Sequence, residues 1–261
     1  MVRSMRHWAF RSGLIEPSGS DRRGGAYRPT ELGSLIFGEA GADPYMEDPG
    51  TAWLVHWQLC SDPYRSPTTW FYLFNDLREQ AFTLPEAVGA LWRLADEAAT
   101  KKASRKTIER DVSCFLRTYT STKPDHKISQ EDTYDSPLAD LRLLQREPET
   151  DRIVFDRSAR PTLPPGIVAF AAVSFWDRVA PDSDTLSFEQ IAYGPGSPGQ
   201  VFKLSENALV DHLESIHEAT SGACSFDSTA GMRQLMRRRR KDPLIVLKDH
   251  YASYGETTHA T

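Results

Sequence analysis

The sequence predicts a mainly α-helical protein with short β-hairpins, built from tandem winged-helix-like units that pack on an aromatic helical core. Three observations support this fold class. Apolar residues recur at helical spacing through most of the chain. Tryptophan, phenylalanine and tyrosine concentrate between residues 51 and 94. A group of helices followed by a pair of short extended segments occurs three times, although sequence identity between the three is too low to establish a repeat.

The first stretch, residues 1–37, carries the clearest pattern. Met1, Met5 and Trp8 lie on one stripe at helical spacing. Gly13 ends the helix, because glycine accepts the left-handed conformation just past a helix end. Two extended arms then flank a glycine-rich basic tip, and an apolar helix follows Pro29. This is the order of the back half of a winged helix-turn-helix, in which the helix enters the major groove of DNA.

Basic residues of this stretch are candidate DNA contacts. Arginine at a flexible tip contributes little to folding and is well placed to bind phosphate. The alternative is an ordinary amphipathic helix with a solvated basic face, followed by a hairpin of no special use. The candidates are Arg3, Arg6, His7 and Arg11 in the helix, and Arg22 and Arg23 at the tip.

Composition limits the class of protein. The chain has 261 residues, of which 39% are hydrophobic and 26% are charged, as expected of a globular protein with a core. No apolar run reaches the ~18 residues that a membrane span needs, and the N-terminus lacks the apolar segment of a signal peptide. Three widely separated cysteines indicate reduced thiols in a cytoplasmic protein rather than disulfides or a zinc site.

The charge is unevenly distributed. A net charge of −5 argues against a protein that coats nucleic acid indiscriminately. Basic residues nevertheless cluster at 3–28, 101–110 and 233–241, and acidic residues at 131–156. This segregation predicts a DNA-binding face and an acidic face for other proteins.

Turn-rich and proline-rich segments divide the chain. Residues 161–166 form the clearest linker. The predicted parts are a partial winged helix-turn-helix unit at 1–50, a central helical, winged-helix-like domain at 51–160, a C-terminal winged-helix-like domain at 161–241, and a loose polar tail at 242–261 that begins with a short apolar run.

Two further basic clusters are candidate DNA contacts. The helix predicted at 104–119 opens with a basic turn, contrary to the helix dipole, which favours acids there. The other cluster is a run of five consecutive basic residues at 237–241. The alternative for both clusters is a solvated charge run. The residues are Lys102, Arg105 and Lys106 in the first cluster, and Arg237, Arg238 and Arg239 in the second.

A candidate metal site lies at residues 43–56. Asp43, Glu47 and Asp48 gather carboxylates on one loop, which suits Mg²⁺ or another divalent cation, and His56 two turns into the next helix is a possible proton carrier. A purely structural cluster is the alternative, because Asp48 also has the position of a helix cap and His56 sits in an apolar helix. The sequence carries no P-loop, HExxH, paired CxxC or GxSxG motif.

Five strings give the chain a family resemblance. The strings are MVRSMRHW (1–8), DPYMEDP (43–49), WLVHWQL (53–59), DVSCFLRTY (111–119) and YGPGSPGQVFKL (193–204). In these strings the chain resembles the SspB proteins, a bacterial domain-of-unknown-function family of single-stranded DNA phosphorothioation systems. Members of this family usually carry a further N-terminal segment, so the chain is expected to be a fragment or to start at an internal methionine.

The resemblance implies a DNA-binding component of a modification and defence system that nicks one DNA strand with a divalent metal. It also implies partners: DNA, a cysteine desulfurase, an ATP-pyrophosphatase-like enzyme and an ATPase, with no membrane partner and with a homodimer as a further possibility. No catalytic residue of the family is carried over. The alternative function is a non-catalytic DNA-binding scaffold or regulator that recruits the modifying enzymes.

Overall fold

The computed structural model describes residues 2–18, 26–97, 103–120, 136–228 and 231–258. Helices dominate, and the strands form one two-stranded and two three-stranded antiparallel sheets within these ranges. The prediction of a mainly α-helical protein with short hairpins is therefore confirmed. No helix in the described ranges combines the length and the apolar character needed to cross a bilayer.

The N-terminal part is a helix, a hairpin and a second helix. Helix α1 (Val2–Arg11) ends where Gly13 adopts a φ of +68°. Strands β1 (Ile15–Pro17) and β2 (Tyr27–Pro29) pair antiparallel, and the predicted tip between them lies outside the described residues. Helix α2 (Glu31–Phe37) begins at Thr30, whose hydroxyl accepts a hydrogen bond from the Gly33 amide.

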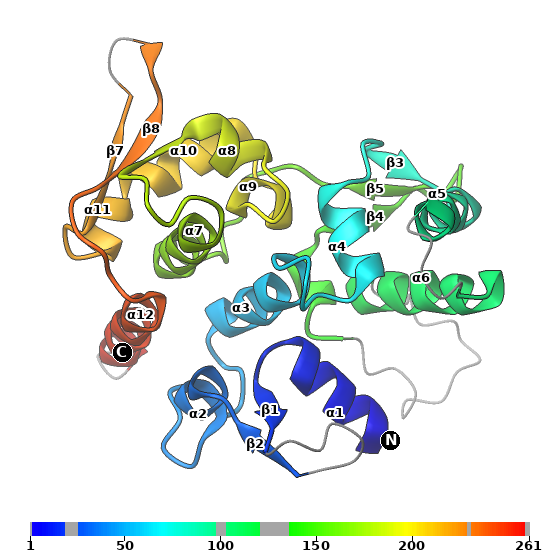
Figure 1. The fold of residues 1–261 in the computed structure, drawn as a ribbon, viewed down its shortest axis with the longest axis horizontal. Helices are drawn as coiled ribbons and strands as arrows, with labels where there is room; N and C mark the ends of the chain where they lie inside the picture. Colours follow the sequence, from blue (N-terminus) through cyan, green and yellow to red (C-terminus); the bar gives the residue numbers. More distant parts are fainter. Residues whose placement is uncertain (1, 19–25, 98–102, 121–135, 229–230, 259–261) are drawn as a thin grey trace.

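Helices α3 (Pro49–Cys60) and α4 (Thr68–Asn75) form the centre of the molecule. Most of α3 is buried, as its uniformly apolar sequence predicts. The core around these helices is rich in aromatic side chains, among them Trp53, Trp57, Trp70, Phe74 and Trp176. Figure 1 shows one three-stranded sheet on either side of α3.

The second unit follows α4. It comprises β3 (Ala81–Phe82), α5 (Leu84–Glu97), α6 (Arg105–Tyr119), a 3₁₀ turn, β4 (Leu144–Arg146) and β5 (Ile153–Phe155). The strand order is β3-β5-β4, so the first strand adjoins the last. A capping box starts α5, since the Thr83 amide donates to the Glu86 carboxylate (2.7 Å) and the Glu86 amide donates to the Thr83 hydroxyl (3.4 Å).

The third unit repeats this order. Helix α7 (Pro165–Val179) precedes β6 (Thr185–Ser187), and the helices α8 (Phe188–Tyr193), α9 (Pro198–Val201), α10 (Glu206–Glu214) and α11 (Ile216–Ala219) follow. The hairpin of β7 (Cys224–Asp227) and β8 (Gln234–Arg237) closes the unit with the strand order β6-β8-β7. A hairpin thus follows the helices of each of the three parts, as the sequence predicts, and the second and third units share the strand order in which the first strand pairs with the last.

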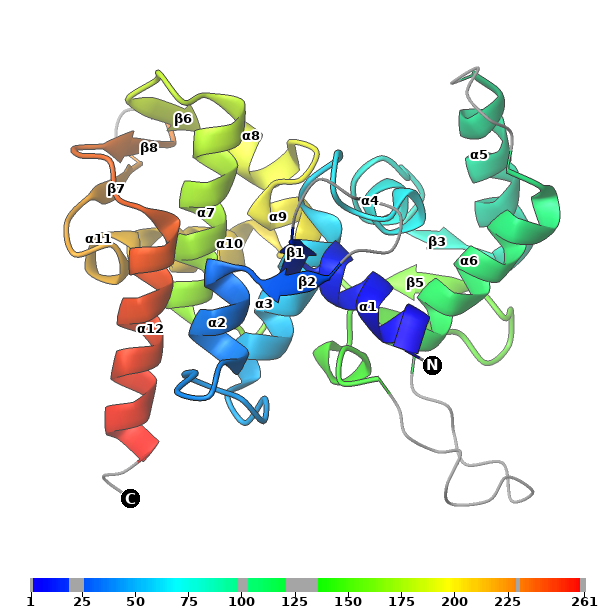
Figure 2. The same ribbon diagram turned by 60° about the horizontal axis from the view of Figure 1, so that its bottom comes forward.

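The prediction of a loose tail at 242–261 is wrong for most of that stretch. Residues Pro243–Thr258 form α12, which packs beside α7 (Figure 2). Val246 and Leu247 are fully buried. His250 lies so close to Gly166 that a Cβ atom added to this glycine would be 2.7 Å from the Cβ of His250. Within the apolar run 244–247, Val246 and Leu247 therefore belong to the buried face of a docked helix, whereas Ile245 is exposed. The polar residues after the run form much of the solvent face.

Candidate nucleic-acid interface

Helix α6 presents a basic face to solvent. Its apolar side, which includes Ile108, Val112 and Phe115, is buried in the core. The first turn carries no acid, and the Ser104 hydroxyl accepts the Thr107 amide (3.2 Å) as the helix cap. Four exposed basic side chains form no ion pair with any described residue: Arg105, Lys106, Arg110 and Arg117. These charges form no ion pair among the described residues that stabilises the fold, whereas binding to the phosphates of a nucleic acid would explain them.

Helix α10 occupies the corresponding place in the third unit and has the opposite charge. Its exposed charged residues are Glu206, Asp211 and Glu214. The Glu206 carboxylate accepts hydrogen bonds from the Tyr193 hydroxyl and from Arg233 (3.3 Å to the latter). Of the two equivalent helices, only α6 has the charge that nucleic acid requires.

Helix α1 adds basic residues near α6. Arg6 is exposed, and its guanidinium lies 5.1 Å from the centre of the Tyr27 ring. Arg11 is half-buried and donates to the backbone oxygen of Arg65 (2.8 Å), so it holds the end of α1 in place. Arg3 belongs to α1, but its side chain is outside what the structure describes. Arg22, Arg23 and Lys102 lie outside the described residues.

A cavity of about 270 Å³ separates α1 from α6 and the start of α4. His7 and Trp8 line it from α1, and Asp111 lines it from α6. Burial and the neighbouring Arg11 lower the pKa of His7, and Asp111 raises it. Burial raises the pKa of Asp111, and His7 opposes that rise. Sequence reasoning missed this pairing, because the two residues are more than one hundred positions apart and no spacing connects them.

The basic run at 237–241 is largely engaged within the protein. Arg237 is buried, forms an ion pair with Asp177 (2.7 Å) and lies over the Trp176 ring (4.4 Å). Arg239 donates to the backbone oxygen of Ser221 (2.7 Å). The side chain of Arg238 is exposed and forms no hydrogen bond or ion pair with any described residue. The sequence could not separate these roles, because Asp177 lies in another helix of the same unit.

The acidic loop at 43–48 serves the fold. The two carboxylate oxygens of Asp43 accept hydrogen bonds from the amides of Glu47 (2.7 Å) and Asp48 (3.1 Å) and from the Thr51 hydroxyl (2.5 Å). One oxygen of Asp48 caps α3 through the Gly50 amide (2.7 Å), and the other lies 3.0 Å from Nε2 of His250 in α12.

Three of the four carboxylate oxygens of Asp43 and Asp48 are thus committed to amides and a hydroxyl, and the fourth, on Asp48, is buried against the His250 imidazole without a hydrogen bond to any described residue. Only the Glu47 side chain is exposed. Nowhere in the described part of the chain do three histidine, cysteine, aspartate or glutamate residues come together as a metal site would require. Asp43, Glu47 and Asp48 therefore do not fit a Mg²⁺ site in this arrangement.

His56 is a core residue. Its Nε2 lies 2.8 Å from the backbone oxygen of Val201, which can only accept, so Nε2 donates and Nδ1 accepts from the Tyr119 hydroxyl (2.8 Å). Burial lowers the pKa of His56 to about 3. The imidazole is thus neutral at ordinary pH and has both nitrogens engaged, which does not suit the proton carrier that the sequence predicted.

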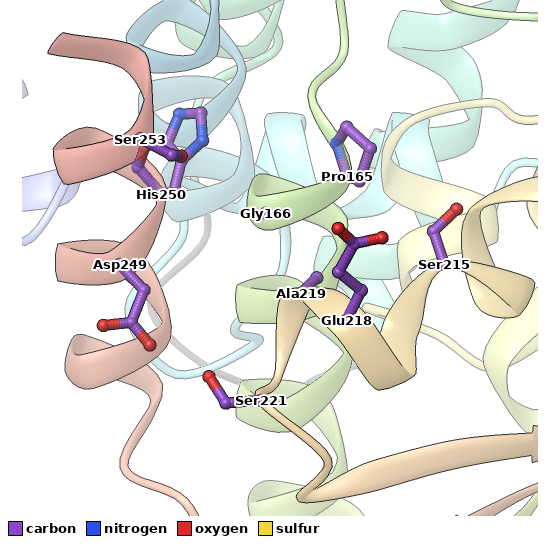
Figure 3. Close-up of a pocket in the computed structure, with 9 residues that line it drawn as sticks. All are labelled: Pro165, Gly166, Ser215, Glu218, Ala219, Ser221, Asp249, His250 and Ser253. Carbon is purple, nitrogen blue, oxygen red and sulfur yellow. The ribbon is translucent and has the colours of Figure 1, made fainter. Parts of the chain in front are cut away.

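A second cavity, of about 550 Å³, lies where α12 meets α7 and α11. Figure 3 shows Asp249 and His250 of α12 on one side, and Glu218 and Ser221 on the other. Lys241 pairs with Asp249 (2.7 Å) and donates to the Ser221 hydroxyl (3.0 Å). These contacts connect α12 to the third unit, and they carry no catalytic arrangement.

The fold and the candidate interface define a helical protein with two equivalent three-stranded units, one of which exposes a basic helix. The chain belongs to the family described as "Protein of unknown function (DUF4007)", whose model matches residues 1–251. It is similar to two solved structures, a crystal structure of SspB and a magnesium ion-bound crystal structure of SspB. Each has a TM-score of 0.84 and 26% sequence identity, and the match covers 97% of this chain and 75% of the other. No curated protein matches the chain.

Proposed function

We propose that the protein is the DNA-binding component of a bacterial DNA phosphorothioation system, and that α6 is its main DNA-contacting helix. The observation that carries the proposal is the exposed and unpaired basic face of α6, together with the acidic face of its counterpart α10. The likeness to SspB supports the assignment to a phosphorothioation system, in which other modification proteins would act beside this one.

The topology supports the same proposal. A winged helix-turn-helix unit consists of a helix, a strand, two helices and a hairpin, and its first strand lies beside its last. In the second unit, α6 follows α5 and precedes the hairpin β4–β5, which is the place of the recognition helix. The basic residues of α1 would extend the interface, since α1 and α6 line a common cavity.

DNA nicking is a second candidate activity, and one observation favours it: the similarity to a magnesium ion-bound SspB structure. Because Asp43 and Asp48 are engaged in the fold, no catalytic step is assigned to them here. Supercoiled plasmid incubated with the protein and Mg²⁺, with and without EDTA, separates a nickase from a scaffold. Mg²⁺-dependent open circles indicate a nickase, and unchanged supercoiled plasmid that the protein still binds indicates a scaffold.

The test of DNA binding is a salt titration with a matched control. Each phosphate contact contributes about 0.9 to the slope of log K against log salt on duplex DNA. Arg105→Ala/Lys106→Ala should lower the slope by about 2 and weaken binding to all sequences. Arg240→Ala/Lys248→Ala removes the same charge from exposed sites that pair with Asp182 and Glu31. Equal losses in both variants would refute the assignment of α6.

A further inference from the structure

We propose that the cavity between α1, α4 and α6 accepts one unstacked nucleobase of a bound single strand, and that guanine is preferred. This inference rests on the proposed DNA binding. The cavity has a volume of about 270 Å³ and is lined by His7, Trp8, Arg11, Pro67, Thr68, Thr69, Trp70, Asp111 and Cys114. Its volume is just below the ~300–1,000 Å³ of pockets that hold drug-sized ligands, so a single base is a suitable occupant.

One wall of the cavity is aromatic and rigid. Trp8 is half-buried. Its ring packs edge-on against the ring of Trp70, with 4.9 Å between the ring centres. Trp70 packs in turn against Phe115 in the core, with 5.4 Å between their ring centres. Trp8 therefore stays in place when the cavity is empty, which reduces the entropic cost of binding a planar ligand. Base stacking on such side chains contributes to single-strand binding without reading the sequence.

Helix α6 offers a carboxylate to the cavity. Asp111 is exposed and forms no hydrogen bond or ion pair with any residue in the described ranges, and the titratable group that acts on it is His7. A carboxylate accepts two parallel hydrogen bonds from adjacent donors. Among the bases, only guanine presents two adjacent donors on its pairing edge, N1–H and the N2 amine. Asp111 therefore favours guanine over the other three bases.

The surroundings suit the rest of the nucleotide. Arg11 lines the same cavity and places positive charge beside it. Arg110 precedes Asp111 on the exposed face of α6. A strand whose phosphates contact these groups would have a base beside the cavity. This combination of a basic track and a nearby aromatic ring is common in proteins that bind single strands.

The test uses fluorescence anisotropy with the 261-residue chain. The probes are labelled oligothymidylates of about twelve nucleotides, within the ~4–16-nucleotide site sizes of single-strand binding folds. Each carries one central guanine, adenine, cytosine or thymine. The guanine probe should bind about tenfold more tightly than the thymine probe. Asp111→Asn should abolish that preference, so that the guanine and thymine probes bind equally, and Glu109→Gln, which changes an exposed acid on the same helix, should retain it.

Equal affinity for the four probes, or a guanine preference that survives Asp111→Asn, would overturn the base pocket while the proposed function stands. Absence of binding to every single-stranded and duplex probe would overturn the proposed function itself. The two failures are therefore distinguishable in one set of titrations.

Discussion

Asp43 is expected to stabilise the fold, and replacing it by asparagine measures by how much. Its carboxylate is buried and accepts three hydrogen bonds, two from amides and one from the Thr51 hydroxyl. Because a carboxylate only accepts, Thr51 donates to Asp43 and must accept from the Tyr251 hydroxyl (2.8 Å). The asparagine side chain has one oxygen, which accepts hydrogen bonds, and one NH₂ group, which only donates. Its NH₂ group would therefore face a backbone amide or a hydroxyl that is itself a donor.

Hydrogen bonds to charged groups contribute roughly 1.5–3 kcal/mol each, and a buried donor left unpaired costs about 1–3 kcal/mol. Asp43→Asn should therefore lower the free energy of unfolding by about 2–4 kcal/mol. Guanidinium denaturation followed by circular dichroism measures this change in the free energy of unfolding. Glu47→Gln, which changes an exposed acid of the same loop, should stay within about 0.5 kcal/mol of wild type. A stable Asp43→Asn protein that has lost a Mg²⁺-dependent activity would refute this reasoning and restore the metal site.

Two further predictions concern buried contacts. Lys203 is buried between Phe74 and Phe155, and burial lowers its pKa to about 7. Between pH 7 and the usual lysine pKa the unfolded chain binds a proton that the folded chain lacks, so the free energy of unfolding should rise by about 1 kcal/mol per pH unit. Lys203→Met should remove that rise in urea titrations at pH 7–9, and an unchanged pH dependence would contradict the buried-amine account. Gly166→Ala should loosen α12, because the new Cβ would lie 2.7 Å from the Cβ of His250. Hydrogen exchange of residues 243–258 should then accelerate while that of α6 does not, and equal protection of α12 in both proteins would contradict its docking at this position.

Features set by neighbouring residues could be predicted from the sequence. The capping box of Thr83 and Glu86, the Asp48 cap of α3 and the end of α1 at Gly13 depend on interactions within a few positions. The hairpins after each helix group follow from short extended runs and their turns. These local preferences all agree with the fold that forms, which is why a mainly helical fold with hairpins followed from them.

Features set by distant residues could not be predicted. Whether a basic residue is free or paired depends on side chains from other elements, and Arg237 is paired with Asp177 while Arg110 is not. The acids at 43 and 48 resemble a metal site in sequence, because the α12 residues that contact this loop lie some two hundred positions away: Tyr251 at Thr51 and His250 at Asp48. The cavity between α1 and α6 also exists only in the folded chain.

The central claim is that α6, and not α10, contacts DNA. Site-specific photocrosslinking tests it most directly, with p-benzoylphenylalanine placed at Arg110 in one protein and at Asp211 in another. Both positions are exposed and lie mid-helix in equivalent places of the two units. Irradiation with labelled DNA should give a strong crosslink from position 110 and little from position 211. Equal yields, or a crosslink from position 211 alone, would contradict the account.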